Sequence, residues 1–188
     1  MLRTLRTPAI FAFAAVVACS DPNARLPASF DNVVDTFTLY SLTTGPLSKP
    51  SAYSLNRHDA VRTWEVGTAF EFAFAMDSTD RALFLTLDVL GLAVSTAVKP
   101  GLKPSTVTFD AMTKAPANGY VTSDTIVVTE GDRFFLRTGV NSCAALGVPL
   151  YGKLEVLDVD TAAQTVQIEV LADQNCGYKG LKPGTPKD

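Results

Sequence analysis

Two neighbouring stretches decide the fold: TAFEFAFAM at residues 68–76 and ALFLTLDVL at residues 82–90. In both, large apolar side chains recur at every second position, which is the period of a β-strand. The residues that share one face are Phe70, Phe72, Phe74 and Met76 in the first stretch and Leu83, Leu85, Leu87 and Val89 in the second. The polar turn MDSTDR separates the two stretches, so we expect them to pair as a β-hairpin.

Further strand-like stretches follow the same pattern. They lie at 33–42, 105–109, 125–130 and 133–138, with a long hairpin over 149–176. Helical periodicity is nowhere sustained, although 109–115 and 141–147 can each form one or two helical turns. The pattern predicts an all-β, mostly antiparallel domain, either a β-sandwich or a closed barrel, of about nine or ten strands with one or two short helical turns.

The second face of the 68–90 hairpin is also apolar or small, for example at Ala73, Ala75 and Phe84. A sheet that is apolar on both faces is either covered on both faces or lines an internal cavity. If a cavity for an apolar ligand exists, we expect its wall to include Phe70, Phe72, Phe74, Leu83, Leu85 and Leu87.

The amino-terminal segment has the layout of an export signal. MLRTLRTP carries two arginines and no acid, and AIFAFAAVVA at residues 9–18 is an unbroken apolar run. Ten residues are too few to span a bilayer, which needs about 20, but they suit the core of a signal peptide.

The run ends Val16-Val17-Ala18-Cys19, and this ending resembles the lipobox of bacterial lipoproteins. The resemblance implies that residues 1–18 are removed and that the Cys19 thiol carries diacylglycerol, with a further acyl chain on the new amine. It also implies a bacterial cell-envelope location, and Ser20 after the cysteine favours the outer membrane. On this division, residues 19–32 are the lipidated cysteine and a tether, and residues 33–188 are a single β domain with a carboxyl-terminal tail.

The two other cysteines, Cys143 and Cys176, form an even pair once Cys19 is assigned to the lipid. Exported proteins reach an oxidising compartment, where pairing is the usual state of such cysteines. We therefore expect a structural disulfide that joins the two flanks of the 149–176 hairpin, and we favour it over a reactive thiol because no CxxC motif is present.

The sequence offers little catalytic chemistry, and we predict no enzyme activity and no cofactor. The only histidine, His58, lies in a polar stretch. Two aspartate pairs, Asp77 with Asp80 and Asp158 with Asp160, are weak candidates both for a calcium site and for paired-acid chemistry, but aspartate is also common in turns. Glu65 and Glu71 near Trp64 suit a sugar site, although an exposed strand face with a core tryptophan is the simpler interpretation.

Charge argues against nucleic acid as a partner. Removal of the leader takes away Arg3 and Arg6, so 14 basic side chains face 19 acidic ones and the formal net charge changes from −3 to −5. Nucleic-acid affinity depends on clustered basic residues. The functional hypotheses are therefore, in order, a membrane-anchored interaction or structural module, a carrier of an apolar ligand, and a hydrolase that uses acidic residues.

Overall fold

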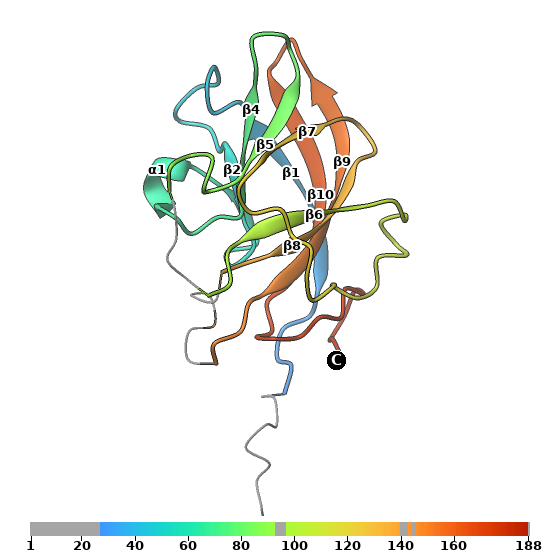
Figure 1. The fold of residues 1–188 in the computed structure, drawn as a ribbon. Helices are drawn as coiled ribbons and strands as arrows, with labels where there is room; N and C mark the ends of the chain where they lie inside the picture. Colours follow the sequence, from blue (N-terminus) through green and yellow to red (C-terminus); the bar gives the residue numbers. More distant parts are fainter. Residues whose placement is uncertain (1–26, 93–96, 140–142, 144–145, 188) are drawn as a thin grey trace, which may run out of the picture.

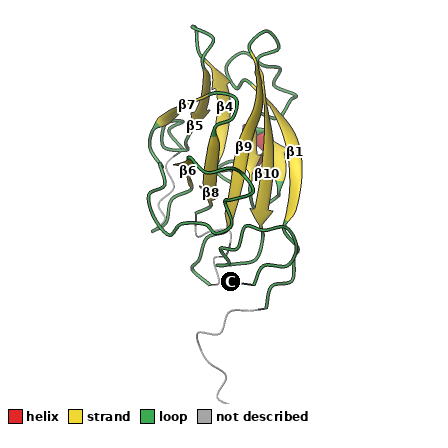
Figure 2. Cartoon of the chain, turned by 90° about the vertical axis from the view of Figure 1, so that its right-hand side faces the viewer, coloured by secondary structure: helices red, strands yellow, loops and turns green. Residues whose placement is uncertain are grey.

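The computed structural model describes residues 27–92, 97–139, 143 and 146–187. Within these residues ten strands form two antiparallel sheets of five strands each, packed face to face (Figures 1 and 2). Figure 2 shows the two layers edge on. The predicted all-β fold is confirmed, and of the two architectures left open the structure is a sandwich and not a closed barrel.

The first sheet contains the long hairpin that the sequence predicted. Its strand order is β1 (Val33–Tyr40), β10 (Thr165–Asp173), β9 (Tyr151–Asp160), β8 (Arg133–Arg137) and β6 (Gly101–Ser105). Pro104 lies in β6, an edge strand of the sheet. Proline has no backbone N–H, and an edge strand tolerates this because one side of it has no neighbouring strand to accept a hydrogen bond.

The second sheet is built around the 68–90 hairpin. Its strand order is β3 (Asp59–Val61), β2 (Ala52–Ser54), β4 (Phe72–Met76), β5 (Ala82–Leu85) and β7 (Thr125–Val128). A four-residue helix, α1 (Thr63–Val66), follows β3.

The core between the sheets is rich in aromatic rings. Phe72 and Phe84 lie side by side with ring centroids 4.3 Å apart, and Phe84 meets Phe134 of the other sheet edge-on at 5.9 Å. Tyr53 joins the same group through Phe72 and Phe37. Aromatic pairs at these separations contribute specific contacts beyond the burial of their surface.

The outer face of each sheet carries its own apolar cluster, so each sheet is partly covered on its outer face as well. On the second sheet, Phe70, Ala73 and Leu87 pack with Val61. On the first sheet, Phe109, Tyr151, Leu171 and Leu181 pack together beneath the loop after β6 and the carboxyl-terminal tail. The 68–90 hairpin is therefore apolar on both faces because one face packs against the other sheet and the other face packs against the outer cluster.

Several sequence boundaries need correction. The strand expected at 105–109 lies earlier, at Gly101–Ser105, and residues 86–91 form turns instead of extending β5. Residues 108–112 form one hydrogen-bonded turn and no helix. Most of 141–147 lies outside the described residues. In the part of the chain that the structure describes, no helix has the length and apolarity needed to cross a membrane.

The two ends of the described chain are tied together at one end of the sandwich (Figure 1). Asn32 and Gly184 exchange two backbone hydrogen bonds of 3.0 Å, and the Asn32 side chain donates to the carbonyls of Gly180 and Lys182. The Asn175 side chain binds the backbone of Ser29 and Phe30. We call residues 29–32, together with 175–185, the clasp.

Candidate functional site

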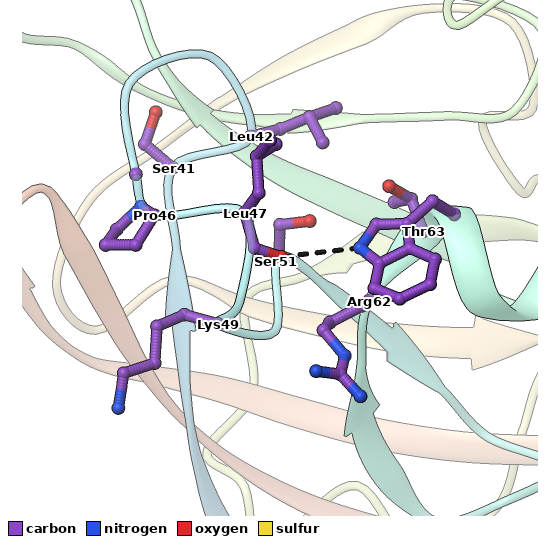
Figure 3. Close-up of a pocket in the computed structure, with 10 residues that line it drawn as sticks. Ser41, Leu42, Pro46, Leu47, Lys49, Ser51, Arg62 and Thr63 are labelled. Atoms are coloured by element: carbon purple, nitrogen blue, oxygen red, sulfur yellow. Dashed lines mark hydrogen bonds between the residues drawn. The ribbon is translucent and has the colours of Figure 1, made fainter.

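A loop and a short helix meet near the end of β1 that lies away from the clasp. The loop at 41–50 follows β1, and α1 follows the short strand β3. The eight residues of β1 separate the two ends of the strand by about 25 Å. A hollow lined by Ser41, Leu42, Leu47, Arg62 and Trp64 lies between the loop and α1 (Figure 3).

The 41–50 loop is held in place by hydrogen bonds to the second sheet. The buried Ser41 hydroxyl accepts a hydrogen bond from the Met76 backbone amide at 3.0 Å, and the Leu42 amide donates to the Phe74 carbonyl at 2.8 Å. Gly45 closes the turn, and a Cβ atom there would lie 2.5 Å from the Ser41 carbonyl oxygen. The loop is therefore a fixed part of the surface.

Trp64 stands on α1 and is 67% exposed, and Leu47 at the loop tip is 80% exposed. The Trp64 indole Nε1 donates to the Leu47 carbonyl oxygen at 3.3 Å, shown as the dashed line in Figure 3. The Arg62 guanidinium lies over the indole, 5.2 Å from its ring, and also pairs with Glu65. We call Leu47, Arg62 and Trp64 the Trp64 patch.

The hollow itself is too small for an organic ligand. Its volume is about 20 Å³, close to the space needed for one water molecule, whereas small-molecule sites occupy several hundred cubic ångströms. On the other side of Arg62 lies a shallow hollow of about 290 Å³, whose wall includes Arg57, Asp59 and Glu65. The arrangement offers exposed apolar surface beside mixed charges.

The structure overturns the sequence interpretation of this region. Trp64 was expected in the core and Glu71 on an exposed face, but Trp64 is exposed and Glu71 is buried. The Glu71 carboxylate accepts a hydrogen bond from the Leu55 amide at 2.6 Å. Burial raises the pKa of Glu71 to about 8. Glu65 and Glu71 therefore do not form a shared sugar site around Trp64.

The six side chains expected to line a ligand cavity are divided between the two faces of the sheet. Phe72 and Phe74 are buried between the sheets, where Phe74 pairs with Phe84. Leu83 and Leu85 pair with Ala75 and Ala73, so they lie on the opposite face and are half-buried. Phe70 and Leu87 belong to the outer cluster. The structure does not bring these six residues together as one wall.

The candidate acidic residues cap turns. Asp77 accepts hydrogen bonds from the amides of Thr79 and Arg81 and pairs with the Arg81 guanidinium, and these contacts lower its pKa. Asp80 adopts a left-handed backbone conformation in the same turn. Asp160, the last residue of β9, accepts hydrogen bonds from two backbone amides in the following hairpin turn. Asp158 lies two residues earlier, within β9. In the described residues no three His, Cys, Asp or Glu side chains gather as a metal site would require.

Cys143 and Cys176 form a disulfide with Cα atoms 5.8 Å apart, and it connects the chain before β9 to the chain after β10. Cys19 and the leader lie outside the described residues. His58 lies in the turn after β2, with Nε2 3.7 Å from the Asp35 carboxylate and its ring against Phe37.

Comparison of the chain with protein-family models, with curated proteins and with solved structures gives no match. The Trp64 patch was missed in the sequence, although one signal for it was present. Leu47 stands in TGPLSKP, where a glycine and two prolines indicate a loop, and an apolar side chain on a loop tip is exposed.

Proposed function

We propose that this protein is a lipid-anchored interaction module of the bacterial cell envelope, which binds a protein partner through the Trp64 patch. The observation that carries the proposal is the exposure of Trp64, the only tryptophan in the chain, on a fixed loop-and-helix platform. An exposed tryptophan and an exposed leucine that adjoin one another form a contiguous apolar surface, and such surfaces with a polar rim mark interaction sites.

The composition of the patch favours a protein as the partner. Tryptophan and arginine are the residue types that most often dominate the binding energy of protein interfaces. The adjoining charges of Arg57, Asp59 and Glu65 supply the polar rim that such interfaces have around an apolar centre. The hollow beside Trp64 is too small to enclose a small-molecule ligand.

The position of the patch suits a protein held by its amino-terminal end. Residues 27–32 enter the sandwich at the clasp, and the Trp64 patch lies at the opposite end of β1. If Cys19 carries the lipid and the clasp end faces the membrane, the patch lies on the far side of the domain. A partner in the adjacent aqueous compartment can then reach it.

The carrier hypothesis receives less support from the packing. The Phe72 and Phe84 rings are in direct contact, and neither has exposed surface. Native mass spectrometry of protein extracted in mild detergent tests this alternative, because a bound apolar ligand would add mass that denaturation releases.

The lipid anchor is tested by intact mass under denaturing conditions. The expected mass is that of residues 19–188 plus acyl groups and minus two hydrogens for the disulfide. A chain that begins at Cys19 without acyl groups would remove the anchor from the proposal while leaving the Trp64 patch to be tested separately.

The binding role is tested by site-specific photo-crosslinking in the native cells. A photoreactive amino acid at Leu47 should give one predominant protein adduct, and Trp64→Ala should abolish it. The same amino acid at Val127, which is 51% exposed on β7, is the matched control and should not give that adduct. An adduct that persists in Trp64→Ala would contradict the proposal, as would equal capture from position 127.

A further inference from the structure

The clasp end of the sandwich has a basic hollow of about 460 Å³. Three lysines line it: Lys114 comes from the loop after β6, and Lys182 and Lys187 come from the carboxyl-terminal tail. All three residues are exposed. The other described residues of the lining are threonine, proline and glycine, so none of the described lining residues carries a carboxylate.

This local charge is opposite to that of the whole chain, which carries more acidic than basic side chains. Among the described residues, no carboxylate lies within ion-pair distance of Lys182 or Lys187. Within the described tail, Thr185 donates a hydrogen bond to the carboxylate of Asp31. The hollow is therefore a cationic surface on an acidic protein.

The hollow lies where the amino-terminal segment enters the domain. The Asn32 side chain donates to the carbonyl of Lys182 itself, at 3.1 Å. Ser29, also in the clasp, is ten residues after Cys19, and ten residues span at most about 35 Å. A lipid on Cys19 would therefore hold this end of the sandwich within about 35 Å of the bilayer surface.

We propose that the hollow formed by Lys114, Lys182 and Lys187 rests on the anionic headgroups of the membrane that anchors the protein. This inference depends on the lipid anchor of the proposed function, and it adds a second contact with the same membrane. Each lysine near an anionic surface strengthens association by about fivefold, and the effect extends only over a Debye length. A contact of this kind would orient the domain with the Trp64 patch outward.

The test uses the extracted protein reconstituted into vesicles of phosphatidylcholine alone or of phosphatidylcholine with phosphatidylglycerol. An amine-reactive reagent labels exposed lysines, and mass spectrometry measures the label at each one. We expect labelling of Lys182 and Lys187 to fall several-fold in the anionic vesicles. Salt at about 1 M, where the Debye length is about 3 Å, should restore it. Lys49, on the loop at the far end of β1, is the internal control and should label equally in both.

Two variants sharpen the result. In the double variant Lys182→Glu and Lys187→Glu, the protection of Lys114 by anionic vesicles should be lost, whereas Lys49→Glu should leave it unchanged. Equal labelling of the tail lysines in both kinds of vesicle would overturn the inference while leaving the anchor intact. Competition by inorganic phosphate with no dependence on the lipid would also overturn it, because the hollow would then be an ion site. Protein that does not float with either vesicle would overturn the anchor and the membrane contact together.

Discussion

The Asn175 side chain holds the backbone of Phe30 through both of its polar atoms. Oδ1 accepts from the Phe30 amide at 3.0 Å, and Nδ2 donates to the Phe30 carbonyl at 2.8 Å. Oδ1 also accepts from Ser29, and Nδ2 donates to the fully buried Asp173. One asparagine thus joins the amino-terminal segment to the end of β10.

The first prediction concerns this link. Asn175→Ala should lower the free energy of unfolding by about 1–3 kcal/mol, because it removes four hydrogen bonds, three of them to the backbone of Ser29 and Phe30. Hydrogen exchange at Ser29 and Phe30 should accelerate more than exchange in β9. Gln174→Ala is the control, since it removes a single exposed hydrogen bond to Asn56 and should change stability little. Unchanged exchange at Phe30 would show that the clasp does not depend on Asn175.

The second prediction concerns the disulfide. The Cys143–Cys176 bond spans 33 residues, so replacing both cysteines by alanine should cost about 2–4 kcal/mol of stability. Urea denaturation measures the change, and reductant should destabilise the natural protein while leaving the double variant unaffected. Thiol titration of the denatured lipidated protein should find no free thiol. Finding two free thiols there would contradict the pairing.

The third prediction concerns pH. The pKa of Glu71 is about 8 in the folded protein because the carboxyl is buried, against 4.5 for an ordinary glutamate. Between these values the folded state retains a proton that the unfolded state has released, so the contribution of Glu71 to stability decreases as pH rises. The slope is about 1.4 kcal/mol per pH unit, and it ends above the folded pKa.

Glu71→Gln isolates this effect, because the glutamine oxygen can still accept from the Leu55 amide. Urea denaturation between about pH 5 and about pH 8 should show that the variant gains stability over the natural protein as pH rises. Burial also raises the pKa of Asp173, so Asp173 likewise contributes a loss of stability as pH rises. This contribution is the same in the variant and in the natural protein. Parallel stability curves for the two proteins would mean that Glu71 does not hold the proton.

The fourth prediction concerns Gly45. A methyl group there would lie 2.5 Å from the Ser41 carbonyl oxygen, so Gly45→Ala should force the 41–50 loop to move. The loop is hydrogen-bonded to Phe74 and Met76 of β4, so we expect a loss of about 1–3 kcal/mol together with reduced crosslinking from position 47. Ser48→Ala, in the same loop but exposed, is the matched control and should affect neither. A Gly45→Ala protein that crosslinks normally would show that the loop shape is not needed for binding.

The sequence predicted the all-β fold, but not the choice between a sandwich and a barrel, because strand periodicity is a local property that does not report how sheets pack. It was sufficient for the hairpin of β9 and β10 and for the pairing of β4 with β5. It could not say which face of β5 is inside, because Leu83, Phe84 and Leu85 are all apolar. The structure places Phe84 inside, opposite Phe74, and leaves both leucines half-buried on the outer face.

Other features depended on contacts that sequence patterns do not report. β2 and β3 have three residues each, which is too short for a period to be recognised. The clasp joins residues about 145 positions apart through side chains that look like ordinary loop asparagines. Trp64 was misplaced because a lone tryptophan usually belongs to a core, whereas here α1 turns it outward.

The most direct test of the central claim uses the fluorescence of Trp64, because it is the only tryptophan in the chain. Acrylamide quenching is measured on the purified protein alone and after addition of the partner captured through Leu47, with a partner engineered to lack tryptophan. Our account predicts solvent-exposed emission and ready quenching in the free protein, then a blue shift and strong protection in the complex. A buried emission spectrum in the free protein, or a complex in which Trp64 remains fully quenchable, would contradict the claim that this patch is the binding surface.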